Sequence, residues 1–337
     1  MVESDKRSVL IAANPKSGAT ESGHIVAELR EAILGRGFPC ELHTSLDEVC
    51  NRANQLAERN ELRAIVSAGG DGTADALANR VSNQVPLLLF PLGTENLLAR
   101  YHGLKADITH ACHVLKTGNQ IRMDVGQAND NLFLVMASCG FDAEVVNEMD
   151  RIRTGHINRW SYTRPILRAL SRYRFPRLTV RSQSSESRSG QNQATPTVQH
   201  ERQTAWLFVF NIPMYAANLD FCPQADPNDG LLDFCMFRQG GIATGLGYFL
   251  RLFMKSHQSM KGFEHWRASQ AEVFVESKIN MPEKPASDEN QKQNKRGTAP
   301  VSFQVDGDPG GTLPLELKVL PERLSLLVPT SHTDPAP

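Results

Sequence analysis

Short apolar runs alternate with amphipathic segments over the first third of the chain. The runs at 8–13, 62–68 and 85–94 have polar boundaries, which is typical of strands buried on both faces of a parallel sheet. Segment 21–34 repeats apolar residues at helical spacing. This alternation of strand, loop and helix predicts a parallel sheet covered by helices.

The pattern changes after Asp124. Two helical segments, at 159–173 and 241–256, lie among runs that alternate or are rich in aromatic residues. Two segments poor in apolar residues, 182–203 and 282–299, predict long solvated loops. The alternating runs predict a β-rich second domain, with strands at 131–139, 177–182, 204–212, 231–237, 270–277, 301–307, 315–320 and 324–329.

Composition and charge narrow the class of protein. The 337 residues carry a formal net charge of −1, so no global field attracts nucleic acid or membrane, and no nucleic-acid partner is expected. No apolar run approaches the roughly 18 residues of a membrane helix, and the six cysteines form no CxxC pair. A cytoplasmic globular protein with reduced thiols is therefore expected.

The stretch VSAGGDGTADAL places Gly69, Gly70 and Gly72 where a predicted strand runs into a helix-like segment. Such loops lie at the carboxyl edge of a parallel sheet, where ligands bind, and glycines let backbone N–H groups approach a phosphate. Thr73 is placed to cap the helix. Asp71 suits a site where a divalent cation or a hydroxyl lies beside phosphates. An ordinary Gly-Asp-Gly turn is the alternative.

Seven motifs occur in order along the chain and carry a resemblance to a known family. They are NPKSG (14–18), GGDGT (69–73), PLGTEN (91–96), MDVG (123–126), GFDAEV (140–145), DGLLDF (229–234) and VDGD (305–308). Together they resemble the catalytic domain of the diacylglycerol kinase family, in its bacterial branch, which is related to sphingosine and ceramide kinases. The first three motifs belong to a superfamily that also holds NAD kinases and 6-phosphofructokinases, and the later four favour lipid kinases.

The resemblance implies a fold and an activity. An N-terminal three-layer α/β domain with a parallel sheet, like that of 6-phosphofructokinase and NAD kinase, is expected over 1–124 and completed by 318–330. A β-sandwich-like domain that accepts the lipid is expected over 125–317, with the nucleotide site in the cleft between the two. Members transfer the γ-phosphate of ATP to a lipid hydroxyl, so ATP, Mg²⁺ and a diacylglycerol-like acceptor are expected.

The nucleotide site that the resemblance implies comes from four loops of the first domain. Lys16 would add a cation beside backbone donors, and a solvated side chain on a loop is the alternative. The expected nucleotide-binding residues are Asn14, Pro15, Lys16, Ser17, Gly18, Thr44, Gly69, Gly70, Asp71, Gly72, Thr73 and Thr94.

Three aspartates are the expected catalytic groups. Asp306 matches the family's general base, which takes the proton of the lipid hydroxyl, and Asp308 stands where the family has Glu. A plain hairpin turn is the alternative for this stretch, since Asp-Gly between strands is a strong turn signal. Asp124 is expected to line the cleft, and a strand-end aspartate satisfied by backbone amides is the alternative.

The resemblance also implies a metal site and shows two departures. Asp226, Asp229 and Leu231 match a site of bacterial members that combines one carboxylate with main-chain oxygens, ligands that suit Mg²⁺; a simple turn is the alternative. Leu97 and Ala76 stand where an aspartate and a glutamate are usual. They motivate a catalytically weak lipid- or nucleotide-binding protein as a second hypothesis, and a NAD kinase-like enzyme is a third.

The segment Arg151–Arg177 holds eight arginines, interleaved with aromatic and aliphatic residues, and no Asp or Glu. Such a segment can lie on an anionic membrane surface, which would bring the kinase to its lipid substrate at the inner face of the membrane. The alternative is a packed helix with its arginines in water. The resemblance is also compatible with a homodimer.

Overall fold

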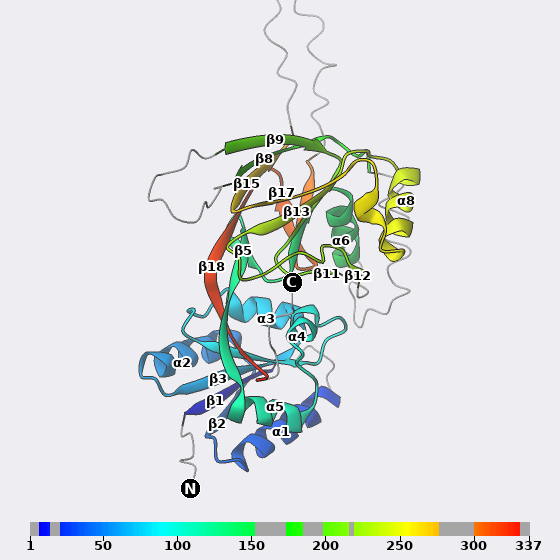
Figure 1. Ribbon diagram of the computed structural model, residues 1–337. Helices are drawn as coiled ribbons and strands as arrows, with labels where there is room; N and C mark the ends of the chain where they lie inside the picture. The colour runs from blue at the N-terminus through cyan, green and yellow to red at the C-terminus, as the bar shows by residue number, and fades with distance from the viewer. Residues whose placement is uncertain are drawn as a thin grey trace, which may run out of the picture.

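Two stacked lobes make up the described part of the chain, which comprises residues 7–13, 21–151, 173–184, 198–215, 219–275 and 300–330 of the computed structural model. Figure 1 shows the N-terminal lobe, a sheet between helices, below a C-terminal lobe built mainly of strands. This architecture confirms the predicted fold class, an α/β domain with a parallel sheet followed by a β-sandwich-like domain.

The N-terminal lobe is a three-layer α/β unit. Its elements are β1 (Ser8–Ala13), α1 (Glu21–Leu34), β2 (Cys40–His43), α2 (Leu46–Glu58), β3 (Leu62–Gly69), α3 (Asp71–Ala78), β4 (Pro86–Pro91), α4 (Leu97–Tyr101) and α5 (Ile108–Thr117). The four strands are parallel in the order β2, β1, β3, β4. All eight residues of β3 are buried, as expected of a strand covered on both faces. The helices α1 and α5 pack together on one face, and α2 and α3 on the other (Figure 1).

Side-chain caps start two of these helices. The Ser45 hydroxyl accepts from the backbone N–H of Glu48 (3.4 Å) at α2, and the Asp107 carboxylate accepts from that of His110 (2.5 Å) at α5, which satisfies groups that a helix start leaves unpaired. The helix α3 has no side-chain cap. The prediction that Thr73 caps it was wrong, because the helix begins at Asp71 and Thr73 lies inside its first turn.

The C-terminal lobe is a sandwich of two sheets. One sheet has six strands in the order β14 (Phe263–Ala268), β13 (Leu232–Phe237), β10 (Trp206–Phe210), β7 (Met136–Cys139), β16 (Ser302–Val305) and β17 (Asp308–Thr312). The facing layer contains β18 (Leu315–Val328), β15 (Gln270–Phe274), β8 (Leu178–Ser184) and β9 (Val198–Thr204), with β5 (Asn119–Ala128) and β6 (Asn131–Phe133) beside β18. Alternate residues of both sheets, such as Phe234, Phe303, Val180 and Leu317, form the core between them.

The strand β18 belongs to both lobes. Its last residues pair in parallel with β4, where Ser325 lies opposite Pro86, and its first residues pair antiparallel with β15. Along its other edge it pairs with β5, and the register shifts between Leu320 and Leu324. Residues 318–330, which the sequence analysis assigned to the first domain, therefore lie in a strand that makes the two lobes one continuous sheet (Figure 1).

The predicted polar loops are shorter than expected or lie outside the described residues. Residues 182–184 end β8 and 198–203 lie in β9, so the prediction of a loop over 182–203 was wrong at both ends. The two strands pair from Leu178 opposite Thr204 to Ser184 opposite Val198. This backbone pairing makes a polar segment an edge strand of the sheet. Loop 282–299 and most of the predicted helix 159–173 lie outside the described residues.

Two helices cover the outer face of the six-stranded sheet. They are α6 (Phe141–Arg151), which sequence patterns alone did not predict, and α8 (Ile242–Phe253), which they did. Side chains of α8, including Tyr248 and Leu252, join the same buried cluster as Trp206 and Phe208 of β10. None of the helices in the described part of the chain is long and apolar enough to cross a bilayer.

Candidate active site at the lobe boundary

The turn from β3 into α3 is built from glycines that leave no room for side chains. A Cβ on Gly69 would lie 2.3 Å from the Thr73 hydroxyl, and a Cβ on Gly93, in the loop after β4, would lie 2.6 Å from the Cα of Gly70. Asn96 closes this second loop, since its side chain accepts from Gly93 N (3.0 Å) and donates to Gly93 O (2.7 Å). The two loops therefore touch backbone to backbone.

Asp71 ties these two loops together. Its carboxylate accepts from the backbone N–H of Leu97 (2.9 Å) and of Leu98 (3.2 Å), at the start of α4. Burial raises the pKa of Asp71, and the two amide donors oppose that rise. The carboxylate that sequence reasoning placed beside phosphates therefore holds α4 against α3. Leu97 is buried at the same place, where its side chain supplies packing and no ligand oxygen.

Asp306 sits in the tight hairpin turn between β16 and β17. Asp306 and Gly307 both have positive φ, 48° and 87°, which is the geometry of a two-residue type I′ turn. The Asp306 carboxylate accepts from the N–H groups of Leu134 (2.6 Å), Val135 (3.0 Å) and Met136 (2.8 Å). The hairpin-turn interpretation of this motif is confirmed, and the turn carries a carboxylate fixed by three amides; the general-base role of Asp306 stays a prediction.

This hairpin meets the start of α3 across the lobe boundary. A Cβ on Gly72 would lie 3.9 Å from the Asp308 carboxylate. Burial and then repulsion by Asp308 raise the pKa of Asp75 to about 6. Burial and then repulsion by Asp75 raise the pKa of Asp306 to about 8, against the three amides. Three carboxylates therefore repel one another beside an exposed glycine of a helix start, a place that favours a cation or a proton.

A buried polar network, which sequence reasoning missed, supports the same hairpin. The Asp142 carboxylate accepts from the hydroxyls of Ser138 (2.5 Å) and Tyr215 (2.6 Å) and from Gln304 Nε2 (3.3 Å). Gln304 Oε1 in turn accepts from Gly307 N (2.8 Å), next to Asp306. Burial raises the pKa of Asp142. The signal was the aspartate inside GFDAEV, and two of its three partners, Tyr215 and Gln304, lie far away in the sequence.

Asp124 takes part in a different set of contacts. It is 3% exposed, and its carboxylate accepts from Gly230 N (2.7 Å) and from Glu322 N in β18 (2.8 Å). Its backbone carbonyl accepts from Asn211 Nδ2 (3.0 Å). Backbone amides satisfy Asp124 as the alternative predicted, but it lies inside β5 and not at a strand end, and its contacts join β5, β18 and the loop before β13.

The carboxylates of the predicted metal ligands, in the loop before β13, already accept hydrogen bonds from other groups of the protein. Asp226 accepts from Asn228 N (3.0 Å), and Asp229 accepts from Leu231 N (2.9 Å) and from the guanidinium of Arg267 (3.0 Å). Burial raises the pKa of Asp229. The metal assignment for this loop stays a prediction, and Arg267 is the group that a cation would have to displace.

One further cluster combines metal-ligating atoms outside this region. Ligand atoms of Cys222, Asp233 and His265 lie within 4.8 Å of one another. His265 Nε2 and Asp233 Oδ1 are only 2.6 Å apart, a direct hydrogen bond that leaves no place for an ion between those two atoms. Although burial opposes it, the bond to Asp233 raises the pKa of His265 to about 9, so the pair is a buried ion pair.

The remaining predicted nucleotide residues divide into two groups. Thr94 and Thr44 are exposed at the ends of β4 and β2, on the carboxyl edge of the parallel sheet. Residues 14–18, which follow β1, lie outside the described residues. The structure thus brings Gly69–Thr73 and Thr94 to one edge, opposite Asp306 and Asp308.

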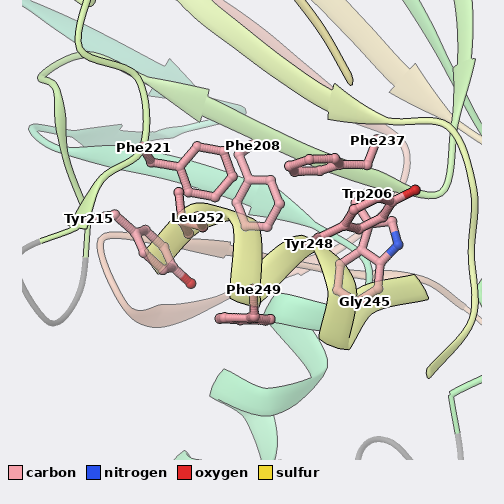
Figure 2. Close-up of a pocket in the computed structure, with 9 residues that line it drawn as sticks. All are labelled: Trp206, Phe208, Tyr215, Phe221, Phe237, Gly245, Tyr248, Phe249 and Leu252. Atoms are coloured by element: carbon pink, nitrogen blue, oxygen red, sulfur yellow. The ribbon is translucent and has the colours of Figure 1, made fainter. Parts of the chain in front are cut away.

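An aromatic cavity lies between α8 and the outer face of the six-stranded sheet (Figure 2). Tyr215, which donates to Asp142, belongs to its wall, so the buried polar network borders the cavity. The lining residues are Trp206, Phe208, Tyr215, Phe221, Phe237, Gly245, Tyr248, Phe249 and Leu252.

A parallel α/β lobe whose glycine turns face a carboxylate-bearing hairpin of a β-sandwich lobe has the architecture of a two-domain kinase. Residues 8–128 match the family model of the diacylglycerol kinase catalytic domain. Residues 135–328 match that of the YegS C-terminal NAD kinase beta sandwich-like domain. The chain belongs to the family of diacylglycerol kinases and YegS-type lipid kinases.

Individual relatives agree with this assignment. A Pseudomonas aeruginosa protein named "Probable lipid kinase YegS-like" is 31% identical over 68% of this chain and 72% of its own length. A Mycobacterium tuberculosis diacylglycerol kinase is 27% identical over 79% of this chain and 77% of its own. An uncharacterised Synechocystis protein is 23% identical over 92% of this chain, which spans 66% of that relative. The crystal structure of a Bacillus anthracis diacylglycerol kinase superposes with a TM-score of 0.63 at 15% identity, covers 97% of this chain and 98% of its own, and shows the shared fold.

Proposed function

We propose that this kinase transfers the γ-phosphate of ATP to a hydroxyl of a diacylglycerol-like lipid in a Mg²⁺-dependent reaction. The observation that carries the proposal is the meeting of Gly72, at the start of α3, with Asp308 and its neighbours across the lobe boundary. The start of α3 suits phosphates, and the carboxylates at the hairpin suit a cation and proton transfer.

The nucleotide side rests on the start of α3 and the loop after β4. The first N–H groups of a helix have no acceptor within the helix, and a helix start favours anions. Gly72 and Thr94 are exposed there, so phosphate oxygens can reach the backbone. Asp71 keeps α3 and α4 in place without pointing a free charge at the phosphates, since two backbone amides donate to its carboxylate.

The donor set at the hairpin fits Mg²⁺. Oxygen ligands suit this ion, and the pKa of Asp75 is raised first by burial and then by the charge of Asp308. Mg²⁺ bound there would neutralise the charge of the phosphates during transfer. Asp75 and Asp308 would hold the ion, while Asp306 keeps its oxygens on the amides of 134–136.

Asp306 is assigned to proton removal from the acceptor hydroxyl. Its pKa of about 8 lies near neutral pH, where a general base works best. The three amides hold the carboxylate in one orientation, and the turn places it next to Asp308. The proton of the lipid hydroxyl would pass to an Asp306 oxygen as the new P–O bond forms.

The aromatic cavity supports a lipid acceptor. Its wall is almost wholly apolar and belongs to the C-terminal lobe (Figure 2), and apolar walls suit acyl chains. Tyr215 connects this wall to Asp142 and Gln304, and Gln304 holds the turn of Asp306. An acyl chain lying against this wall would therefore have its glycerol end beside polar groups.

A phosphorylation assay with labelled ATP tests the proposal. Detergent-dispersed diacylglycerol, sphingosine, ceramide and phosphatidylglycerol are compared with NAD, with and without Mg²⁺. Labelled phosphatidic acid in the presence of Mg²⁺ supports the proposal. Labelled NADP would establish a NAD kinase-like enzyme instead, and nucleotide binding without any labelled product would establish a binding protein.

A further inference from the structure

Large apolar side chains lie exposed along one side of α8. The exposed fractions are 51% for Ile242, 72% for Leu246, 37% for Phe249, 62% for Leu250, and 67% for both Phe253 and Met254. Their spacing of four, three and one residues places them on one face of the helix. Six of the nine large apolar residues that are exposed in the described chain thus gather on this single element.

The other face of α8 is firmly packed. Gly245, Tyr248 and Leu252 are buried against the sheet. A Cβ on Gly245 would lie 2.8 Å from the indole of Trp206, so only glycine permits this close approach. The helix is therefore held rigidly with its second apolar face pointing outward, at the outer edge of the C-terminal lobe (Figure 1).

We propose that this outward face of α8 docks the kinase onto an anionic lipid bilayer; the proposal rests on the proposed lipid acceptor. Helices with one apolar face and basic residues beside it bind the membrane interface in this way. The sequence of α8 contains no acidic residue, its exposed Arg251 lies beside the apolar face, and the exposed Lys255 and Lys261 follow it. Lys255 pairs with Asp220 at 2.7 Å, so anionic headgroups complement mainly Arg251 and Lys261.

The position of the cavity favours a bilayer over a protein partner. Phe249 belongs both to the exposed face and to the wall of the aromatic cavity, where Figure 2 labels it. A bilayer lipid that contacts this face would already lie against the wall of the cavity.

Sedimentation with vesicles tests the docking face without using kinase activity. The variant carrying Leu246→Glu and Phe253→Glu is compared with the wild type and with Ile25→Glu, which changes an exposed apolar residue of α1. On vesicles of phosphatidylcholine and phosphatidylglycerol, the double variant should lose at least about tenfold in affinity, while Ile25→Glu keeps it. Pure phosphatidylcholine vesicles should bind the wild type less, and added salt should weaken binding to the mixed vesicles only.

Three results would overturn the proposal: no binding by the wild type, equal binding by the double variant, or an equal loss with Ile25→Glu. A concentration-dependent dimer that Leu246→Glu dissolves would assign the face to a second copy of the chain instead. Activity on detergent-dispersed diacylglycerol is measured in parallel and should be unchanged in the double variant. If no variant phosphorylates any lipid, the proposed function fails, whatever the vesicles show.

A gain of signal gives an independent readout. Phe253→Trp places an indole on the exposed face, far less buried than the native Trp206. Its fluorescence should shift to the blue and become protected from a soluble quencher when mixed vesicles are added. An unchanged spectrum at vesicle concentrations that sediment the protein would show that another surface binds.

Discussion

Asp71, at the start of α3, and Asp306, in the hairpin turn, are both aspartates followed by glycine, and both carboxylates accept N–H groups from a segment distant in sequence. Burial raises the pKa of both; the next cause is the amide donors for Asp71 and the charge of Asp75 for Asp306. The first aspartate mainly holds two loops of one lobe together. The pKa of Asp306 depends on the charge of Asp75, which lies in the other lobe. The same Asp-Gly motif therefore has different roles in different surroundings.

Removing the negative charge of Asp306 should have the largest effect. We expect Asp306→Asn to lower turnover by about 10²-fold or more, the usual contribution of general base catalysis. Asparagine tolerates the positive φ of the turn, so the hairpin should persist. Steady-state rates at saturating lipid and an ATP-binding titration measure the effect, with Asp130→Asn, an exposed turn aspartate, as the matched control. Normal turnover would remove Asp306 from the mechanism, and lost ATP binding would move it to the nucleotide site.

Asp71→Ala should cost both stability and activity. Two buried amides at the start of α4 would lose their acceptor, which costs about 1–3 kcal/mol in the free energy of unfolding. The loop with Thr94 should then shift and turnover should fall. Urea unfolding and rates measure the two effects, and Asp71→Asn should restore part of the stability. A variant with full stability and low turnover would instead give Asp71 a direct role at the phosphates.

The glycines of the two loops offer a graded comparison. A Cβ at Gly93 would collide with Gly70 at 2.6 Å, whereas a Cβ at Gly72 would meet Asp308 at an ordinary 3.9 Å. We expect Gly93→Ala to lower the thermal midpoint and weaken ATP binding, because backbone must move. Gly72→Ala should keep the midpoint and change only nucleotide binding or turnover. Equal midpoints for both variants would contradict the backbone-to-backbone contact.

The pH profile should give the smallest effect. The raised pKa of Asp306, about 8, means that turnover rises with pH as the base loses its proton. Asp75→Asn removes a like charge and one proposed Mg²⁺ ligand, so the turnover that remains should show a rising limb shifted to lower pH by roughly one unit or less. The folded state binds the proton of Asp306 more tightly than the unfolded chain does. The free energy of unfolding should therefore fall as the pH rises from the ordinary carboxyl pKa of 3.8 to about 8. A limb that stays in place would show that Asp75 and Asp306 are uncoupled.

Sequence reasoning predicted most of the fold because burial leaves a plain pattern. The apolar run of β3 and the alternating runs of the sandwich indicated their own structures, and the family was confirmed. The edge strand β9 was missed because VQHERQT is polar, and only its pairing with β8 makes it a strand. The helix α6 was missed because its first residues belong to the motif GFDAEV, which was used to identify the family and not to predict secondary structure.

The sequence predicted which residues belong to the candidate site, but not which residues they contact. The motifs located Gly72, Asp306 and Asp308, since turn chemistry is local. They could not show that Asp71 caps α4, or that Asp142 reaches Gln304, because those partners come from other elements. Nor could composition show which face of α8 is exposed, since that helix is apolar on both sides.

The strand β18 also has a consequence for how this protein is made. It completes the N-terminal sheet beside β4 and the C-terminal sheet beside β15, yet it is translated after all the other described strands. During synthesis β4 therefore waits with an open edge while more than half of the chain is translated, and unpaired edges recruit other strands. Neither lobe can finish folding before Val328 has emerged, so a nascent chain stalled earlier would depend on chaperones to stay unaggregated.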